Sequence, residues 1–188
     1  MSKHPGVRAD AITALAEVFR EHGYEGATLT RLSAGSGLGK GSLYHFFPGG
    51  KDEMVAVVLE EIDQWFTKQV FEPLRHADDP AAAIRSMMIT IDAYFRSGRR
   101  TCLVGAFALS DVRDFFALQI AQYFAAWRDA LSVALQRLGH APPDADDMAE
   151  DIVAGIQGAL VAARALDDEA LFLRALRRME RRLDLPLT

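Results

Sequence analysis

The chain has 188 residues, of which 50% are hydrophobic and 25% charged. This composition supports a full hydrophobic core in one or two domains and excludes a disordered chain. The single cysteine, Cys102, excludes an internal disulfide framework and is typical of a reducing cytoplasm. The sequence shows no signal peptide and no apolar run of about 20 residues, so we expect a soluble, cytoplasmic protein with no membrane partner.

The formal net charge of −5 is divided unequally along the chain. Residues 1–51 carry six lysines and arginines against four acids, a net charge of +2, whereas the remainder carries 15 against 22, a net charge of −7. A basic face matters more for binding phosphate than the charge of the whole chain does. The asymmetry therefore indicates a mildly basic head on an acidic body.

The first 50 residues predict three helices. Residues 7–22 repeat apolar side chains at helical spacing, and a glycine follows them. Thr28 or Thr30 then offers a hydroxyl to cap a short helix over residues 29–34, and a Gly-Ser-Gly run separates it from another over residues 39–46. Three helices in such a short stretch, the last two joined by a glycine turn, match the helix-turn-helix plan.

The third helix presents residue types that suit phosphate and base-edge contacts, while Leu43 and Phe47 are predicted to face inward. Lys51 begins the next helix, where free amides help to bind a phosphate. Thr28 and Thr30 can do the same, although capping alone also explains them, and a solvated helix face is the alternative for the whole set. The candidate DNA-binding residues are Thr28, Thr30, Arg31, Lys40, Gly41, Ser42, Tyr44, His45 and Lys51.

The residue types of the head also limit how it can read bases. The chain contains no asparagine, and all its glutamines follow residue 60. Bidentate amide contacts with adenine are therefore missing from the head. Base discrimination has to come from Lys40 and Arg31, from hydroxyls, from aromatic contacts with thymine methyl groups, or from DNA shape.

The glycine run over residues 35–41 fails the known nucleotide-binding patterns. A Walker loop ending at Gly39-Lys40 needs glycine where Ala34 stands and a hydroxyl where Gly41 stands. The GxGxxG dinucleotide fingerprint fails because Lys40, Ser42 or Tyr44 stands where its third glycine is needed. No HExxH metal motif and no GxSxG nucleophile motif occurs. The sequence therefore predicts no cofactor, no metal and no catalytic site.

The run GLGKGSLYHFFPGGKDEM, residues 37–54, resembles the recognition helix and following segment of the tetracycline-repressor (TetR) family of bacterial transcription regulators. Gly39 departs from the serine that is commoner at its position. The loop Pro48-Gly49-Gly50 is one residue longer than the common form and resembles the LmrA/YxaF-like subgroup. The resemblance covers residues 7–60, and beyond them only the helical pattern and the length agree.

This resemblance implies an all-α protein of about nine helices with two domains. Residues 1–50 are expected to form the three-helix DNA-binding domain, and residues 51–188 the ligand-binding and dimerisation domain. The body helices are predicted over residues 51–75, 79–98, 111–138, 144–166 and 168–183. The first of these is the natural link between head and body.

The predicted helix over residues 144–166 is apolar around so much of its surface that it needs partners on more than one side, and the helix over residues 168–183 is apolar on one side with arginines on the other. They either complete the core of the monomer or form a four-helix bundle with a second subunit. The family resemblance favours the homodimer, with an interface formed by Ile152, Ile156, Leu160, Leu176 and Met179.

The family resemblance also implies a ligand cavity inside the helical body. Most aromatic residues there are core residues, but some of them should line a pocket. The candidate ligand-binding residues are Phe66, Met88, Tyr94, Phe107, Phe124 and Trp127.

The sequence thus predicts a transcriptional regulator rather than an enzyme. We expect a repressor that binds a palindromic double-stranded DNA operator as a homodimer and is released by a small, largely apolar effector. The alternative is a helical DNA-binding dimer without a physiological ligand. Cys102 is interpreted as a small buried residue, with redox sensing as its alternative.

Overall fold

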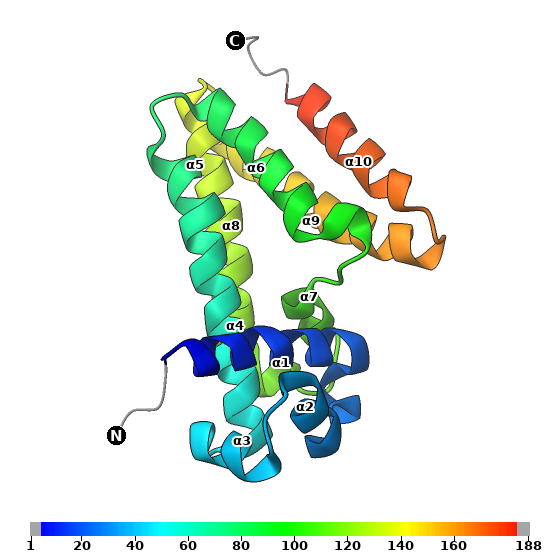
Figure 1. The fold of residues 1–188 in the computed structure, drawn as a ribbon. Helices are drawn as coiled ribbons and strands as arrows, with labels where there is room; N and C mark the ends of the chain where they lie inside the picture. The colour runs from blue at the N-terminus through cyan, green and yellow to red at the C-terminus, as the bar shows by residue number, and fades with distance from the viewer. Residues whose placement is uncertain (1–4, 184–188) are drawn as a thin grey trace. The chain divides into compact units, whose positions relative to one another are not determined.

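The computed structural model describes residues 5–183, and these form α-helices, short 3₁₀ turns and one π-helical turn, with no strand (Figure 1). The predicted all-α architecture is confirmed. The chain divides into two compact units. The head unit comprises Met1–Gln64 and Leu103–Ile120, and the body unit comprises Trp65–Cys102 and Ala121–Thr188.

The head unit begins with three helices that pack on one another. Its helices are α1 (Pro5–Gly26), α2 (Leu29–Ser36), α3 (Lys40–Phe46), α4 (Gly50–Phe66) as far as Gln64, and α7 (Leu103–Ala108). Helix α1 packs against both α2 and α7. The core of the unit includes Leu15, Phe19 and Leu32, whose side chains are buried.

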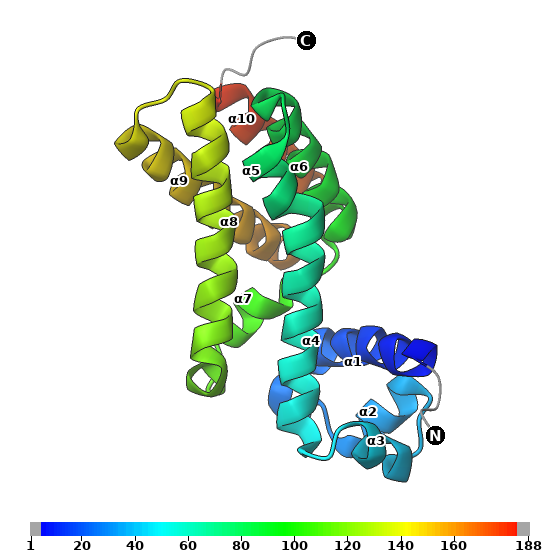
Figure 2. The same cartoon turned by 90° about the vertical axis from the view of Figure 1, so that its left-hand side faces the viewer.

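The body unit is built from longer helices, which Figure 2 shows from a second direction. They are α5 (Glu72–His76), α6 (Pro80–Tyr94), α8 (Ala117–Arg137) from Ala121, α9 (Pro142–Ala165) and α10 (Glu169–Arg182). Helices α9 and α10 form a hairpin and pack along each other. Phe66, Phe95 and Trp127 are completely buried in this unit.

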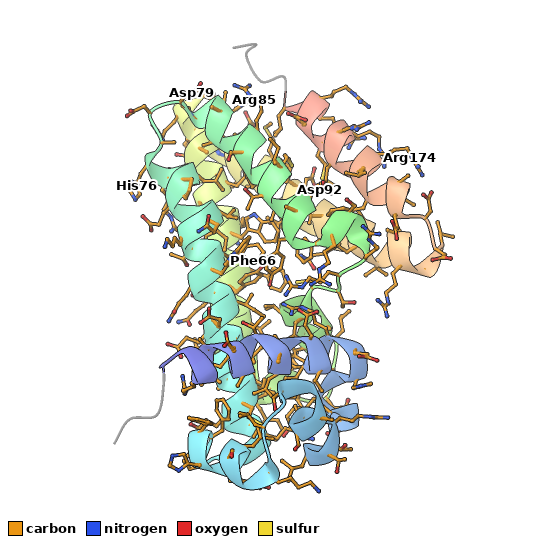
Figure 3. All side chains as sticks on the ribbon, viewed as in Figure 1. Phe66, His76, Asp79, Arg85, Asp92 and Arg174 are labelled. Atoms are coloured by element: carbon orange, nitrogen blue, oxygen red, sulfur yellow. The ribbon has the colours of Figure 1, made fainter. Side chains whose placement is uncertain are left out.

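Side-chain caps fix where two body helices begin. Asp79 accepts a hydrogen bond from the Ala82 amide at 2.9 Å, and Pro80 follows at the first position of α6, where a missing amide costs nothing (Figure 3). Asp168 caps α10 in the same way by accepting from the Leu171 amide at 3.2 Å. The predicted start at Asp79-Pro80 is confirmed.

The helix predicted over residues 51–75 is interrupted. After α4 the chain forms a π-helical turn, Thr67–Phe71, before α5 begins. The Glu72 amide donates to the Thr67 carbonyl five residues earlier. Pro73 has no amide to donate, so the wider turn ahead of it lets the helical path continue across the proline.

The predicted helix start at Asp111 is wrong. Ser110 Oγ donates to the Phe107 carbonyl at 3.0 Å, and the Arg113 amide donates to the Ser110 carbonyl at 3.0 Å. These local bonds favour turns over a regular helix. The chain forms a 3₁₀ turn, Arg113–Phe116, and α8 begins only at Ala117.

Helix α6 also ends earlier than predicted. Arg96 and Ser97 have φ of 50° and 54°, a left-handed conformation that stops the helix after Tyr94. Gly98 follows with φ of 93°. A Cβ there would lie 2.9 Å from the Cβ of Phe172 on α10, so the close approach of this turn to α10 requires glycine.

Candidate nucleic-acid interface

The helix-turn-helix of the head unit is anchored by apolar side chains at its centre. Leu32 on α2 is buried, and Leu43 and Phe47 are both 0% exposed. The predicted inward direction of Leu43 and Phe47 is confirmed. Because these side chains fill the core, the opposite face of α3 is left toward the surface.

The turn between α2 and α3 is more ordered than a glycine break. Helix α2 continues to Ser36, and Gly37, with φ of 69°, ends it in the left-handed conformation. Ser33 Oγ donates to the Leu38 carbonyl at 2.6 Å, while Ser36 Oγ accepts from the Leu38 amide at 3.3 Å. These bonds fix the angle at which α3 leaves α2.

Eight of the nine predicted DNA-binding residues are exposed. Seven of the nine lie on α2 or α3, Thr28 directly precedes α2, and Lys51 lies in the first turn of α4. Tyr44 is 52% exposed, which is unusual for a large ring. Thr28 is the N-cap of α2, with its hydroxyl accepting from the Arg31 amide at 3.4 Å. The Arg31 guanidinium donates to the Gly26 carbonyl at 2.7 Å, so this arginine also ties α2 to the end of α1.

Lys51 is the partly buried member of the predicted set. Its Nζ donates to the backbone carbonyl of Tyr24 at 3.0 Å and lies 4.0 Å from the centre of the Tyr24 ring. The Tyr24 hydroxyl donates to Asp52 Oδ1. Sequence reasoning missed Tyr24, because no local pattern pairs two residues 27 positions apart.

Tyr24 remains a hydrogen-bond donor at physiological pH. Burial, followed by the hydrogen bond to Asp52 and the charges of Asp52 and Glu25, raises the pKa of Tyr24 to about 12. Each of these factors disfavours the phenolate. The hydroxyl therefore stays protonated wherever the protein works.

A shallow depression of about 170 Å³ lies beside Lys51. It is bordered by Thr28 and Leu29 at the start of α2, by Tyr44 on α3, and by Gly50 and Lys51 at the start of α4. Its remaining lining residues are Ala27, Leu32 and Met54. The beginnings of α2 and α4 and the residue Lys51 therefore border this depression. The first amides of a helix have no intrahelical partner, which makes such helix starts suitable for binding anions.

Five of the six predicted ligand-binding residues lie in the body unit, and Phe107 lies in the head unit. The Phe66 ring is 4.8 Å from that of Tyr94 and 5.5 Å from that of Trp127. Phe124 joins this cluster through Tyr123, and Met88 is buried on α6. Phe107 instead packs on Phe19 and Phe116.

Several buried polar atoms of the body unit make no hydrogen bond within the described part of the chain, and two of them belong to residues of α6 and α8. They are Nε1 of Trp127, on a side chain that is 0% exposed, and Oδ1 of Asp92 on α6 (Figure 3). Buried polar atoms are normally paired. Trp127 is among the residues predicted for the ligand site, but no sequence pattern reveals an unsatisfied nitrogen.

Four of the five residues predicted for the dimer interface are buried within one protomer, and Met179 is half-buried. Ile152, Ile156, Leu160 and Leu176 are buried, and the terminal methyl of Met179 would be 2.6 Å from a Cβ placed on Gly155. These side chains close the contact between α9 and α10.

Within residues 5–183, no group of three or more histidine, cysteine, aspartate or glutamate side chains could hold a metal ion. Across the same described range, no helix is both long enough and apolar enough to cross a membrane. Cys102 is buried and forms no disulfide.

A buried anchor, a hydrogen-bonded turn and an exposed polar helix define a helix-turn-helix protein with a separate helical body. Comparison with known families agrees over both parts. Residues 11–58 match the model described as bacterial regulatory proteins, tetR family. Residues 80–178 match the model described as transcriptional regulator LmrA/YxaF-like, C-terminal domain. The chain belongs to the TetR family of DNA-binding transcriptional regulators, in its LmrA/YxaF-like subgroup, and this family is one of regulators rather than enzymes.

Individual relatives support the same assignment. The regulator LmrA of Bacillus subtilis is 28% identical over 88 residues, which is 47% of each chain. The uncharacterized regulator YxaF of the same bacterium is 22% identical over 92% of this chain and 93% of its own. The chain thus spans about half the length of LmrA but most of YxaF.

Solved structures share the fold at low sequence identity. A TetR regulator from Legionella pneumophila superposes with a TM-score of 0.79 at 17% identity, over 96% of this chain and 98% of that one. A TetR regulator from Agrobacterium tumefaciens gives 0.77 at 21% identity, over 94% and 96% of the two chains.

Proposed function

We propose that this TetR-family regulator is a ligand-responsive repressor. It binds a palindromic operator as a homodimer and leaves the DNA when a small, largely apolar effector binds its body unit. The observation that carries the proposal is that α3 exposes its polar face while its apolar side is buried. Leu43 and Phe47 hold this helix from one side, while its exposed residues, from Lys40 to His45, are available to the major groove.

An exposed face of α9 supports the homodimer. Ala154, Gly158, Val161 and Ala165 recur at helical spacing and are all exposed. Small residues let two helix backbones approach closely, and Val161, which is 64% exposed, supplies apolar area. Four of the five residues predicted for the interface are buried in the protomer, so the proposed interface is extended to this exposed face.

The aromatic cluster around Phe66 supports an effector site in the body unit. Pockets for small ligands are mostly apolar, with a few polar groups that fix the ligand's orientation. Trp127 Nε1 and Asp92 Oδ1 are polar groups of this kind, because neither has a partner among the described residues. An effector can displace the regulator from DNA only if it binds the two conformational states with different affinity.

Selection of bound duplexes from a random pool tests the first part of the proposal. The expected product is a sequence with two-fold symmetry, because two equivalent heads read equivalent half-sites. The selected duplex then serves in a screen for compounds that release the protein. Recovery of only asymmetric sequences would contradict the dimeric operator, and a dimer that no compound releases would favour a regulator without a ligand.

Lys40→Ala tests whether α3 is the recognition helix. Lys40 is exposed at the start of α3, so we expect its loss to weaken binding to the selected operator by about 1–3 kcal/mol. The measurement is a fluorescence anisotropy titration. Lys68→Ala is the matched control, because Lys68 is an exposed lysine of the body unit. Equal affinities for both variants and the wild type would remove Lys40 from the interface.

A further inference from the structure

Tyr24 joins the last turn of α1 to the first turn of α4. Its backbone carbonyl accepts a hydrogen bond from Lys51 Nζ at 3.0 Å, and its ring lies 4.0 Å from the same nitrogen. Its hydroxyl donates to Asp52, the neighbour of Lys51. One tyrosine thus makes two contacts with Lys51 and a third with the residue that follows it.

These contacts restrict a side chain that is otherwise flexible. A lysine ammonium is a point charge at the end of four rotatable carbons, so a free lysine loses entropy when it meets a phosphate. The Tyr24 ring attracts the ammonium through its negative face, and the carbonyl accepts one of its three donors. The bond from the Tyr24 hydroxyl to Asp52 fixes the plane of the ring.

Lys51 is one of the residues that line the depression between α2, α3 and α4. Thr28, Tyr44 and Gly50 also line it. Two neighbouring acids accept hydrogen bonds within the protein, Asp52 from the Tyr24 hydroxyl and Glu53 from the Gly49 amide at 2.6 Å. A lysine that is held in place beside the beginnings of α2 and α4 suits an oxygen of the DNA backbone.

We propose that Tyr24 is a positioning residue for DNA binding, which holds the Lys51 ammonium in place to receive a backbone phosphate at this depression. The inference rests on the proposed DNA-facing role of α2, α3 and the start of α4. Tyr24 thus joins the proposed DNA-binding residues although it makes no contact with DNA itself. Tyr24 acts through its ring and carbonyl, and its hydroxyl secures the ring.

Binding to a 40-base-pair duplex of mixed sequence, followed by anisotropy across a range of salt concentrations, tests the inference. This probe suits a phosphate contact, which is independent of sequence. Tyr24→Leu removes the ring but keeps the carbonyl, and we expect it to weaken binding by about three- to tenfold and to lower the salt slope by up to about 1. Tyr24→Phe keeps the ring over the ammonium and should retain most of the affinity.

Double variants separate positioning from general damage to the head. Combined with Lys51→Ala, Tyr24→Leu should cause no further loss, because the group that it positions is already gone. Combined with Lys40→Ala, its effect should be additive, because Tyr24 contacts Lys51 and Asp52 on α4, whereas Lys40 begins α3. Equal additivity in both pairs, or an unchanged salt slope for Tyr24→Leu, would overturn the inference.

A measurement without DNA checks the geometry directly. Protons next to Nζ of Lys51 lie over the Tyr24 ring, so their NMR signals should be shifted upfield in the wild type and in Tyr24→Phe, but not in Tyr24→Leu. Unshifted signals in the wild type would overturn the positioning role even if DNA binding is normal. Conversely, a wild-type protein that shows the shift but binds no duplex at low salt would refute the proposed DNA contacts themselves.

Discussion

Two aspartates show how the surroundings of a single residue set its contribution to stability. Burial on α4 raises the pKa of Asp63, so folding disfavours its charged form. The pKa of Asp168 is lowered, chiefly by its hydrogen bond from Arg174, whose Nη2 lies 2.6 Å from Asp168 Oδ2 (Figure 3). Folding therefore favours the charged form of Asp168.

Replacement of each aspartate by asparagine should change stability in opposite directions at pH 7. Asp63→Asn removes a charge that folding disfavours, so its melting temperature should exceed that of the wild type. Asp168→Asn loses the ion pair with Arg174 but keeps an N-cap side chain, so its melting temperature should fall slightly.

The difference at Asp63 should shrink already as the pH falls toward its unfolded pKa of about 4, whereas the difference at Asp168 should shrink only below about 4. The destabilising effect of the charge on Asp63 disappears as the pH falls through the raised pKa of Asp63. The stability that Asp168 contributes is lost as the pH falls through the lowered pKa of Asp168. Melting curves at several pH values measure both effects. Differences that stay constant with pH would show that packing rather than charge separates the variants.

At the scale of elements, α1 and α2 are held together by a contact that only glycine permits. A Cβ on Gly35 would lie 2.3 Å from a methyl carbon of Val18. A separation below 3 Å cannot be tolerated without movement of one helix or of the valine. Gly35 was first interpreted as a helix breaker, but it lies inside α2 and sets the distance between two helices.

Gly35→Ala should therefore destabilise the head by about 1–3 kcal/mol through overpacking. Val18→Ala removes the opposing methyl groups and is itself destabilising, but the double variant should be more stable than the sum of the two single effects predicts. Gly41→Ala is the control, because no atom lies within 4 Å of the added carbon. Chemical denaturation measures all four proteins, and strict additivity of Gly35→Ala and Val18→Ala would exclude the proposed contact.

Local sequence patterns predicted the elements that depend on local chemistry. The caps at Thr28 and Asp79, and the inward direction of Leu43, follow from spacing and residue type. The contacts that set the site's geometry join distant residues, such as Lys51 with Tyr24, and no periodic pattern encodes them. The apolar periodicity of α9 likewise does not distinguish a residue that packs inside the protomer, such as Ile156, from one that is exposed, such as Val161.

At the scale of the whole molecule, the apolar residues of the α9–α10 hairpin divide into two sets. One set closes the protomer core, as Ile156 and Leu176 do. The other is exposed at the end of α9, where Val161 is 64% and Leu166 is 68% exposed. A two-fold dimer uses the same patch on both subunits, so these exposed residues can bury one another in a four-helix bundle.

Val161→Glu tests this assembly. A two-fold axis brings identical patches together, so the variant places two carboxylates in the same apolar contact, where burial of an unpaired charge is costly. We expect sedimentation to show a monomer and the melting temperature to lose its dependence on protein concentration. Affinity for the symmetric operator should fall by about 100-fold or more, because the two heads no longer bind as one unit.

Ile89→Glu is the matched control for this variant. Ile89 on α6 is 72% exposed, slightly more than Val161, but it lies outside the α9–α10 hairpin. The same change of charge there should leave the mass, the melting behaviour and the operator affinity close to those of the wild type. If both variants stay dimeric, the dimer forms through another surface, and if both dissociate, added negative charge rather than the face of α9 controls the assembly.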